Sequence, residues 1–403
     1  MNVEKKIPEI RFKGFDDEWK RFTLGELGSV ATNKRIFIHE TSLIGDVPFY
    51  KIGTFGREPK LFISQELFDN YKKRYPFPEK GDLLFSVIGS IGRVVEYTGE
   101  DEYFQDSNVV WLKHDGAIVN SFLKQFYSIV EWEGIEGSTI KHLYNRTILG
   151  TKIQKPSKEE QTQIGNTFQK LDSLINQHQQ KHDKLSNIKK AMLEKMFPKQ
   201  GETIPEIRFK GFSGEWVESS LAEEAVVNTG YPFDSADFSE DGDLLVITNG
   251  NIQNNSSAVA GKVGNRISSD KVPSLIQYKL NLGDILVTMD GSVGRTAKVI
   301  ERNQILAQRV GRLVAKKNTE FLYQSLNTGD FLETMTTISH GGTIKHISLS
   351  EIGSYILQVP KDIDEQAKIG SYLKQLDTLI NQQKQQITKL NNVKQACLKK
   401  MFV

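Results

Sequence analysis

Two stretches of the chain carry a hydrophobic residue at most of the positions spaced three or four apart and are largely polar in between. They cover residues 156–198 and 360–403. Steps of three and four place these side chains on one stripe of a helix, a pattern typical of coiled coils. The sequence therefore predicts two long helices whose stripes bury each other. The stripes include Leu171, Ile175, Leu185, Ile188 and Met192 in the first helix, and Leu376, Ile380, Leu390 and Val393 in the second.

Polar residues interrupt both stripes, at His178, His182 and Gln383. Polar positions in such a seam usually fix which residues pair, so we interpret them as register-setting residues and not as metal ligands. The chain must return after the first helix, and an antiparallel pair is the simplest closed arrangement. Ser157 and Asp362 are the candidate residues for capping the two helix starts.

The rest of the chain, residues 1–155 and 199–359, has a different texture. Short apolar or alternating runs are separated by Gly, Asn, Ser and Thr, which predicts short strands. Two longer runs, at 121–132 and 320–335, predict short helices. Each of these stretches therefore reads as a mixed α/β domain.

The chain is also a tandem duplication. PEIRFKGF occurs at 8–15 and again at 205–212, and the helix sequence of 171–197 returns at 376–402. The predicted fold class is therefore α+β: two mixed α/β domains joined by two long antiparallel coiled-coil helices, with pseudo-twofold internal duplication. The domain boundaries follow as 1–155, 156–198, 199–359 and 360–403.

Composition narrows the class of protein. The 403 residues are 38% hydrophobic and 25% charged, as in ordinary globular proteins, and the net charge of +2 permits nucleic-acid binding without demanding it. Cys397 is the only cysteine, which excludes an internal disulfide and a cysteine zinc cluster. The start lacks the apolar core of a signal peptide and no apolar run reaches membrane length, so we expect a cytoplasmic protein without membrane contact.

Catalytic motifs are missing from the sequence. It contains no GxxxxGK[ST] phosphate loop, no HExxH and no GxSxG. It also lacks the Asn/Asp-Pro-Pro-Tyr/Phe stretch of amino-methyltransferases. This favours a binding protein over an enzyme.

Two repeated motifs are candidates for contacting an anionic partner. GSIGR and GSVGR contribute Ser90, Arg93, Ser292 and Arg295, because glycines admit a close backbone approach and arginine can bind phosphate or guanine. STIKH and GTIKH contribute Lys141, His142, Lys345 and His346 after Gly-rich loops. The alternatives are a tight β-turn with a surface arginine and a solvated loop.

Two further stretches are candidates in one copy only. KKRYPFP contributes Lys72, Lys73 and Arg74 beside aromatic residues, as on nucleic-acid surfaces, although a charged turn would look the same. TNGNIQNN contributes Asn249 and Asn251, whose amides can read adenine, although Asn-rich loops are usually only turns.

The order of these motifs, PEIRFKGF…EW, GDLLFS..GSIGR, STIKHL and the helix sequence, repeated in full, resembles the specificity subunit of type I restriction–modification systems. The resemblance implies two target recognition domains, each reading half of a split double-stranded DNA site. It implies helices that bind modification subunits. It implies no catalysis and no cofactor in this subunit.

The resemblance also implies the partners. Two modification subunits would carry S-adenosylmethionine and methylate adenine, and two restriction subunits would use ATP and Mg. Because the variable loops of the two copies differ, we expect the two half-sites to differ in sequence. The rival interpretations are a nuclease or methyltransferase acting alone, which lacks a motif here, and a non-catalytic two-domain scaffold that binds proteins.

Overall fold

The computed structural model describes residues 7–137, 141–253, 257–261, 263–271 and 275–402. The chain forms two compact units. Unit 1 comprises residues 1–179 and 385–403, and unit 2 comprises residues 180–384. The boundary between the units falls inside both long helices, so each unit contains part of each helix.

The described residues of unit 1 form three sheets. A four-stranded antiparallel sheet has the order β2-β8-β5-β6, a three-stranded sheet has the order β4-β3-β7, and β1 pairs with β9. In the three-stranded sheet β3 runs antiparallel to β4 and parallel to β7. The strands are β1 Lys20–Thr23, β2 Ser29–Ala31, β3 Val47–Tyr50, β4 Leu61–Ile63, β5 Leu83–Ser86, β6 Val94–Glu96, β7 Tyr103–Phe104, β8 Val109–Lys113 and β9 Lys152–Lys155.

Unit 2 repeats this plan strand for strand. The equivalent sheets have the orders β11-β17-β14-β15, β13-β12-β16 and β10-β18, again with a single parallel pair, β12 with β16. The strands are β10 Val217–Ser220, β11 Ala225–Thr229, β12 Leu244–Ile247, β13 Arg266–Ile267, β14 Ile285–Thr288, β15 Thr296–Lys298, β16 Gln304–Leu306, β17 Val310–Ala315 and β18 Ile356–Val359.

Short helices connect and cover these sheets. In unit 1 they are α1 Leu24–Leu27, η1 Ile38–Glu40, α2 Gln65–Arg74, α3 Asn120–Ile129 and α4 Asn145–Gly150. In unit 2 they are α6 Leu221–Glu224, η2 Ser235–Asp237, η3 Asn249–Asn251, η4 Ser269–Lys271, η5 Ile276–Tyr278, α7 Thr319–Ser325, α8 Asp330–Ile338 and α9 Leu349–Gly353. The run at 320–335, predicted as one helix, is therefore two, because Gly329 adopts a φ of 117° between them, a backbone conformation that α-helices exclude.

The two long helices lie where the hydrophobic repeat predicts them. They are α5 Lys158–Lys195 and α10 Ile363–Met401. The predicted caps are in place: the Glu160 amide donates to the Ser157 hydroxyl at 3.3 Å, and the Asp364 amide donates to the Asp362 carboxylate at 2.8 Å.

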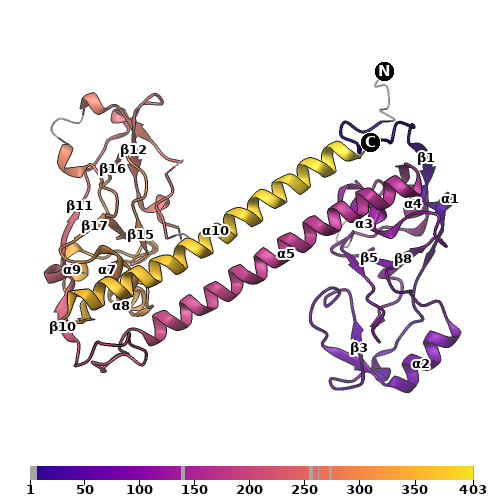
Figure 1. The fold of residues 1–403 in the computed structure, drawn as a ribbon, viewed down its shortest axis with the longest axis horizontal. Coiled ribbons are helices and arrows are strands. Elements are labelled where there is room, and N and C mark those ends of the chain that lie inside the picture. Colours follow the sequence, from indigo (N-terminus) through magenta and orange to yellow (C-terminus); the bar gives the residue numbers. More distant parts are fainter. Residues whose placement is uncertain (1–6, 138–140, 254–256, 262, 272–274, 403) are drawn as a thin grey trace. The chain divides into compact units, whose positions relative to one another are not determined.

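Within each unit the start of one long helix packs beside the end of the other, so the pair is antiparallel (Figure 1). In unit 1, Leu171 of α5 packs in a cluster with Leu398 of α10, and Lys394 donates to Asp172 at 2.6 Å. In unit 2, Leu185, Ile188 and Met192 of α5 pack against a cluster that includes Leu376 of α10, and Lys189 donates to Asp377 at 2.6 Å.

Burial along the seam is uneven. Ile175, Ile380 and Leu390 are half-buried and Gln383 is buried, whereas Val393 is 41% exposed. His178 and His182 are half-buried. A two-helix pair covers only one side of each helix, which leaves residues at the edge of the stripe in contact with solvent.

The repeated octapeptide and the tryptophan that follows it contact both long helices in each unit. In unit 1 the Arg11 guanidinium donates to both carboxylate oxygens of the buried Glu160, in the first turn of α5, and the Ile10 amide donates to the Lys400 carbonyl near the end of α10. Trp19 packs edge-on against Phe402 at a centroid distance of 6.0 Å. One short segment therefore holds the start of α5 and the end of α10.

The second copy makes the same contacts in unit 2. Arg208 donates to both oxygens of Glu365 at 2.7 Å, and the Ile207 amide donates to the Lys195 carbonyl at 2.8 Å. Trp216 packs edge-on against Phe197 at 5.9 Å. The octapeptide recurs because each unit needs the same attachment for its pair of helix ends.

Candidate functional site

The turn that carries GSIGR in unit 1 is a tight hairpin loop between β5 and β6. The Gly92 amide donates to the Ser86 carbonyl at 2.8 Å, and the Arg93 amide donates to the Ser86 hydroxyl at 3.1 Å. Gly89 and Gly92 adopt φ values of 68° and 81°, which disfavour other residues. The glycines of the motif are therefore explained by the turn itself.

Unit 2 builds the same loop between β14 and β15 around Thr288. Its hydroxyl accepts from the Arg295 amide at 3.0 Å and donates to the Ser292 carbonyl at 2.5 Å. A Cβ at Gly294 would lie 2.7 Å from the Cβ of Met335. The loop conformation is thus common to both units, and Ser90 and Ser292 occupy its exposed tip.

The hairpin motif (GSIGR or GSVGR) and the lysine motif (STIKH or GTIKH) are far apart in the sequence but lie side by side in each unit. In unit 1, His142 forms antiparallel bridges with Ile88 and with Glu136, and the Leu143 amide donates to the Val87 carbonyl at 2.8 Å. Lys141 is exposed beside this bridge. Residues 138–140 of the STIKH motif lie outside the described residues.

The same junction forms in unit 2. His346 bridges to Asp290 and to His340, and the Gly291 amide donates to the Lys345 carbonyl at 2.8 Å. The Lys345 side chain is exposed. In each unit an exposed lysine and a Gly-Ser hairpin tip are therefore held together by backbone pairing.

The hairpin residue that pairs with the motif histidine is one of the positions at which the two junctions differ. Ile88 in unit 1 corresponds to Asp290 in unit 2, and both form the bridge to the motif histidine. Nδ1 of His346 lies 2.5 Å from Asp290. Nδ1 of His142 is buried without a hydrogen-bond partner among the described residues, since an isoleucine cannot supply one.

Asp290 is a mostly buried carboxylate whose two oxygens are both engaged. Besides His346, the Arg309 guanidinium donates to it at 2.9 Å. Burial alone would raise the pKa of Asp290, but the hydrogen bonds from His346 and Arg309 outweigh burial and lower the pKa below its usual value. The motif search did not single out Asp290 or Arg309, because they lie on different turns and no local spacing relates them.

The two motif arginines have different surroundings. Arg93 is half-buried and donates to the Phe55 carbonyl at 3.0 Å. Arg295 is also half-buried, and its guanidinium has no hydrogen-bond or ion-pair partner among the described residues. Part of the donor capacity of Arg93 is thus used to tie the hairpin to the loop after β3.

The basic run Lys72, Lys73 and Arg74 forms the exposed last turn of α2. Lys72 lies over the rings of Phe68 and Phe77 at 4.8 and 5.3 Å and pairs with Asp101 at 3.3 Å. Both phenylalanines belong to a hydrophobic cluster of unit 1. The aromatic residues of this run therefore support the fold, and the basic residues lie outside.

The asparagine loop after β12 is held by its own amides. The Asn251 side chain accepts from the Thr248 amide at 3.0 Å and donates to the carbonyls of Ala260 and Val263 at 2.9 and 2.8 Å. Asn249 accepts from the Met289 amide at 3.3 Å. Asn251 is 5% exposed, so its amide is engaged in holding this loop.

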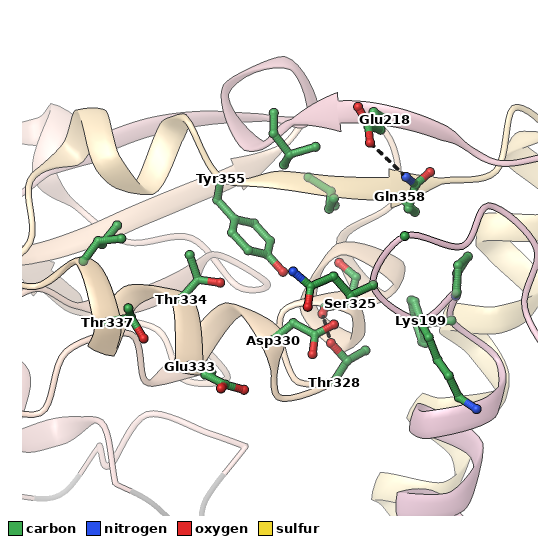
Figure 2. Close-up of a pocket in the computed structure, with 17 residues that line it drawn as sticks. Lys199, Glu218, Ser325, Thr328, Asp330, Glu333, Thr334, Thr337, Tyr355 and Gln358 are labelled. Carbon is green, nitrogen blue, oxygen red and sulfur yellow. Dashed lines mark hydrogen bonds between the residues drawn. The ribbon is translucent and has the colours of Figure 1, made fainter.

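Unit 2 also has a cavity of about 540 Å³ at the base of β10 and β18 (Figure 2). Asp330, Glu333 and Thr334 of α8 line one side, and Gln358 donates to Glu218 at 3.5 Å on the other. Burial, with a smaller contribution from Asp330, raises the pKa of Tyr355 in this wall to about 12. No residue of the two repeated motifs lines the cavity, so it is separate from the junction described above.

Over the ranges that the structure describes, no group of three or more His, Cys, Asp or Glu side chains is arranged to hold a metal ion. In the same ranges no helix is long and apolar enough to span a bilayer.

Comparison with known proteins identifies a family over most of the chain. Residues 16–187 and 213–391 match the family described as type I restriction modification DNA specificity domain. A putative type I restriction enzyme specificity subunit of Haemophilus influenzae is 46% identical over 162 residues, which are 40% of this chain and 42% of that protein. The type I restriction enzyme MjaVIII specificity subunit of Methanocaldococcus jannaschii is 25% identical over 304 residues, 70% of each protein.

A solved structure shares the fold. The crystal structure of the type I restriction–modification system S subunit from M. genitalium aligns with a TM-score of 0.64 and 18% identity, covering 98% of this chain and 99% of that one. The predicted α+β architecture, with two α/β domains and two long helices, is confirmed.

Proposed function

Because this chain belongs to the family of type I restriction–modification DNA specificity domains, we propose that it is the subunit that reads a split double-stranded DNA site. Unit 1 would read one half-site and unit 2 the other. Partner modification subunits would methylate adenine within the site, and restriction subunits would cleave DNA. The S-adenosylmethionine, ATP and Mg that these reactions need would be bound by the partners, two copies of each.

The observation that supports this proposal is the repeated junction of hairpin tip and lysine loop. The same backbone pairing occurs in both units, whereas Ile88 and Asp290 differ at one equivalent position. A common framework with different side chains suits two related readers of different base sequences. Exposed Lys141 and Lys345 supply positive charge for phosphates, which adds affinity without sequence preference.

The long helices would bind the modification subunits and set the distance between the half-sites. Their stripe keeps apolar residues at the surface, including Leu174, Leu379 and Val393, which are 43%, 40% and 41% exposed. Exposed apolar residues along a helix pair suit packing of further helices from a partner. The chain itself would contribute no catalytic group.

The test is a genome-wide map of methyladenine in the host, with the gene intact and with the gene deleted. We expect one split, asymmetric motif to lose methylation on deletion. Expression of the gene on a plasmid restores that motif. An unchanged map in a strain whose modification subunits are expressed would contradict the proposal and favour a protein-binding scaffold.

A further inference from the structure

Each unit has an exposed arginine held by a mostly buried aspartate, although the two pairs occupy different positions of the repeat. In unit 1, Asp106 lies in the turn before β8 and Arg35 follows β2; in unit 2, Arg309 lies in the turn before β17 and Asp290 in the hairpin after β14. Nε of Arg35 donates to Asp106 at 3.1 Å, and NH1 of Arg309 donates to Asp290 at 2.9 Å. The arginine side chains are 61% and 66% exposed, whereas the aspartates are 17% and 14% exposed.

Both turns lie against the hairpins described above. The Val87 amide donates to the Asn108 carbonyl at 3.0 Å, and the Met289 amide donates to the Arg309 carbonyl at 3.3 Å. Val87 and Met289 also accept from the lysine loops through their carbonyls. In unit 2 the arginine–aspartate pair therefore belongs to the hairpin surface, because Asp290 directly precedes Gly291 of the hairpin, and in unit 1 the turn that carries Asp106 packs against the equivalent hairpin.

The aspartates are fixed from within the protein. Asp290 is held by His346 from the lysine loop. Asp106 lies in a turn that Thr32 ties to the segment bearing Arg35, since the Thr32 hydroxyl donates to the Val109 carbonyl at 3.0 Å and accepts from the Ser107 amide at 3.0 Å. The Asp290 carboxylate is thus fixed by a second side chain, and the turn that carries Asp106 is fixed through its backbone.

The backbone at Arg309 is in an unfavourable conformation. Its φ is 67°, in the left-handed region that few residues other than glycine adopt. Such residues persist where the surrounding structure requires them, and they concentrate at functional sites. An exposed ion pair adds little stability, so stability does not explain why an arginine occupies this turn.

The hydrogen bonds leave a free edge on each guanidinium. Arg35 uses Nε and keeps NH1 and NH2, while Arg309 uses NH1 and keeps Nε and NH2. Two adjacent N–H groups match the O6 and N7 acceptors of guanine in the major groove, which is the commonest specific arginine contact with DNA. An aspartate behind the arginine fixes the plane of this fork before DNA binds, which lowers the entropy lost on binding.

We propose that Arg35 and Arg309 are base-reading residues, each recognising one guanine in the half-site of its unit, and that Asp106 and Asp290 are positioning residues. This inference rests on the proposed function and adds the identity of one base in each half-site.

The test uses the complex of this chain with its modification subunits and duplexes of the methylated motif. Each guanine of a half-site is replaced in turn by 7-deazaguanine, which lacks the N7 acceptor but keeps its base pairing. With the unmodified protein we expect one guanine per half-site at which the replacement weakens binding by about 10- to 100-fold. In R309A that loss disappears for the guanine of the second half-site alone, and in R35A for the guanine of the first alone.

Two variants separate base reading from charge. R309K keeps the charge without the fork and should behave as R309A. R302A removes an exposed arginine that has no carboxylate partner among the described residues; it should weaken all duplexes alike or none. Because Arg35 and Arg309 are largely exposed, we expect all these variants to fold, and thermal unfolding of each variant checks this.

The outcomes are distinct from those of the proposed function. If deletion of the gene removes a split motif but R35A and R309A methylate that motif unchanged, or if neither half-site contains guanine, the base-reading role is wrong and the family function stands. If each variant accepts other bases at one guanine position of the methylated motif, the result supports the base-reading role. D290N should relax base preference at the same position of the motif as R309A. A role of Asp290 in stability alone would leave base preference unchanged.

Discussion

Arg11 of the repeated octapeptide donates two parallel hydrogen bonds, of 2.7 and 2.8 Å, to the carboxylate of Glu160 in the first turn of α5. The carboxylate is 1% exposed and the arginine side chain 11% exposed. Arg208 and Glu365 repeat this geometry in unit 2. Removing one partner of a buried ion pair that is joined by two hydrogen bonds is strongly destabilising, because the remaining charge is left buried without a partner.

Arg11→Ala should therefore destabilise unit 1 by about 3–5 kcal/mol, because Glu160 remains buried and unpaired. The measurement is the free energy of unfolding from denaturant titration. Lys13→Ala, at an exposed position of the same octapeptide, is the matched control and should change little. Replacing Arg11 and Glu160 together by methionine should cost less than Arg11→Ala; an equal or greater cost would contradict this account.

Gly165→Ala and Gly370→Ala should both destabilise the protein, although alanine usually stabilises a helix by about 1 kcal/mol relative to glycine. A Cβ at Gly165 would lie 2.0 Å from the Ser121 hydroxyl oxygen, and one at Gly370 would lie 2.7 Å from the Phe321 amide nitrogen. Gly150→Ala in α4 is the control, since a Cβ there meets nothing within 4 Å. Thermal unfolding of the three variants decides between clash and helix propensity.

Lys345→Ala should weaken DNA binding by the complex to a similar degree on every sequence. A lysine that contacts one phosphate contributes to salt dependence and not to base choice. We expect the slope of log affinity against log salt to become shallower by about one. An altered methylation motif would instead assign Lys345 a role in base reading.

Asp290→Asn should reduce the loss of unfolding free energy that the protein undergoes as the pH falls into the acid range. The folded pKa of Asp290 is lowered, so this carboxylate stabilises the fold at pH values above the ordinary aspartate pKa of about 3.9. That stabilisation is lost as the pH falls through the lowered pKa. The variant should differ most from the parent protein near neutral pH and least at the acid end. Denaturant unfolding between pH 7 and pH 3 measures this, and a constant difference across the range would contradict it.

Adding one heptad to α5 and one to α10 at paired positions should change the gap of the methylated motif and leave both half-sites unchanged. Seven residues lengthen a helix by about 10 Å, or about three base pairs of DNA. A heptad keeps the apolar stripe in phase. The methyladenine map of a strain carrying this variant gives the new gap; an unaltered gap would show that the helices do not set the spacing.

The sequence predicts the parts of the fold that depend on local periodicity. The three-and-four repeat placed α5 and α10 within a few residues of their bounds, and the duplication predicted two matching units. The break at Gly329 escaped prediction because the apolar pattern of 320–335 continues through it. A positive φ depends on the turn that the surrounding chain requires, which periodicity does not report.

The site was predicted only in pieces. The motifs around Arg93 and His142 were found because they repeat, but their junction through Ile88 joins positions more than 50 residues apart and leaves no local signal. The pairing of Asp290 with Arg309 is hidden for the same reason. The DNA contacts assigned to the motif residues remain predictions, and the hydrogen bonds of Asn251 show that its amide also has a structural role.

The bridge to the motif histidine has the same backbone form whether the opposing residue is Ile88 or Asp290. The hairpin thus accepts an apolar or a charged side chain at this position without a change of conformation. Substitutions there would alter the chemistry of this surface and leave the backbone pairing in place. If this surface reads bases, single substitutions at this position would give new target preferences. The octapeptide contacts that hold the long helices would stay the same.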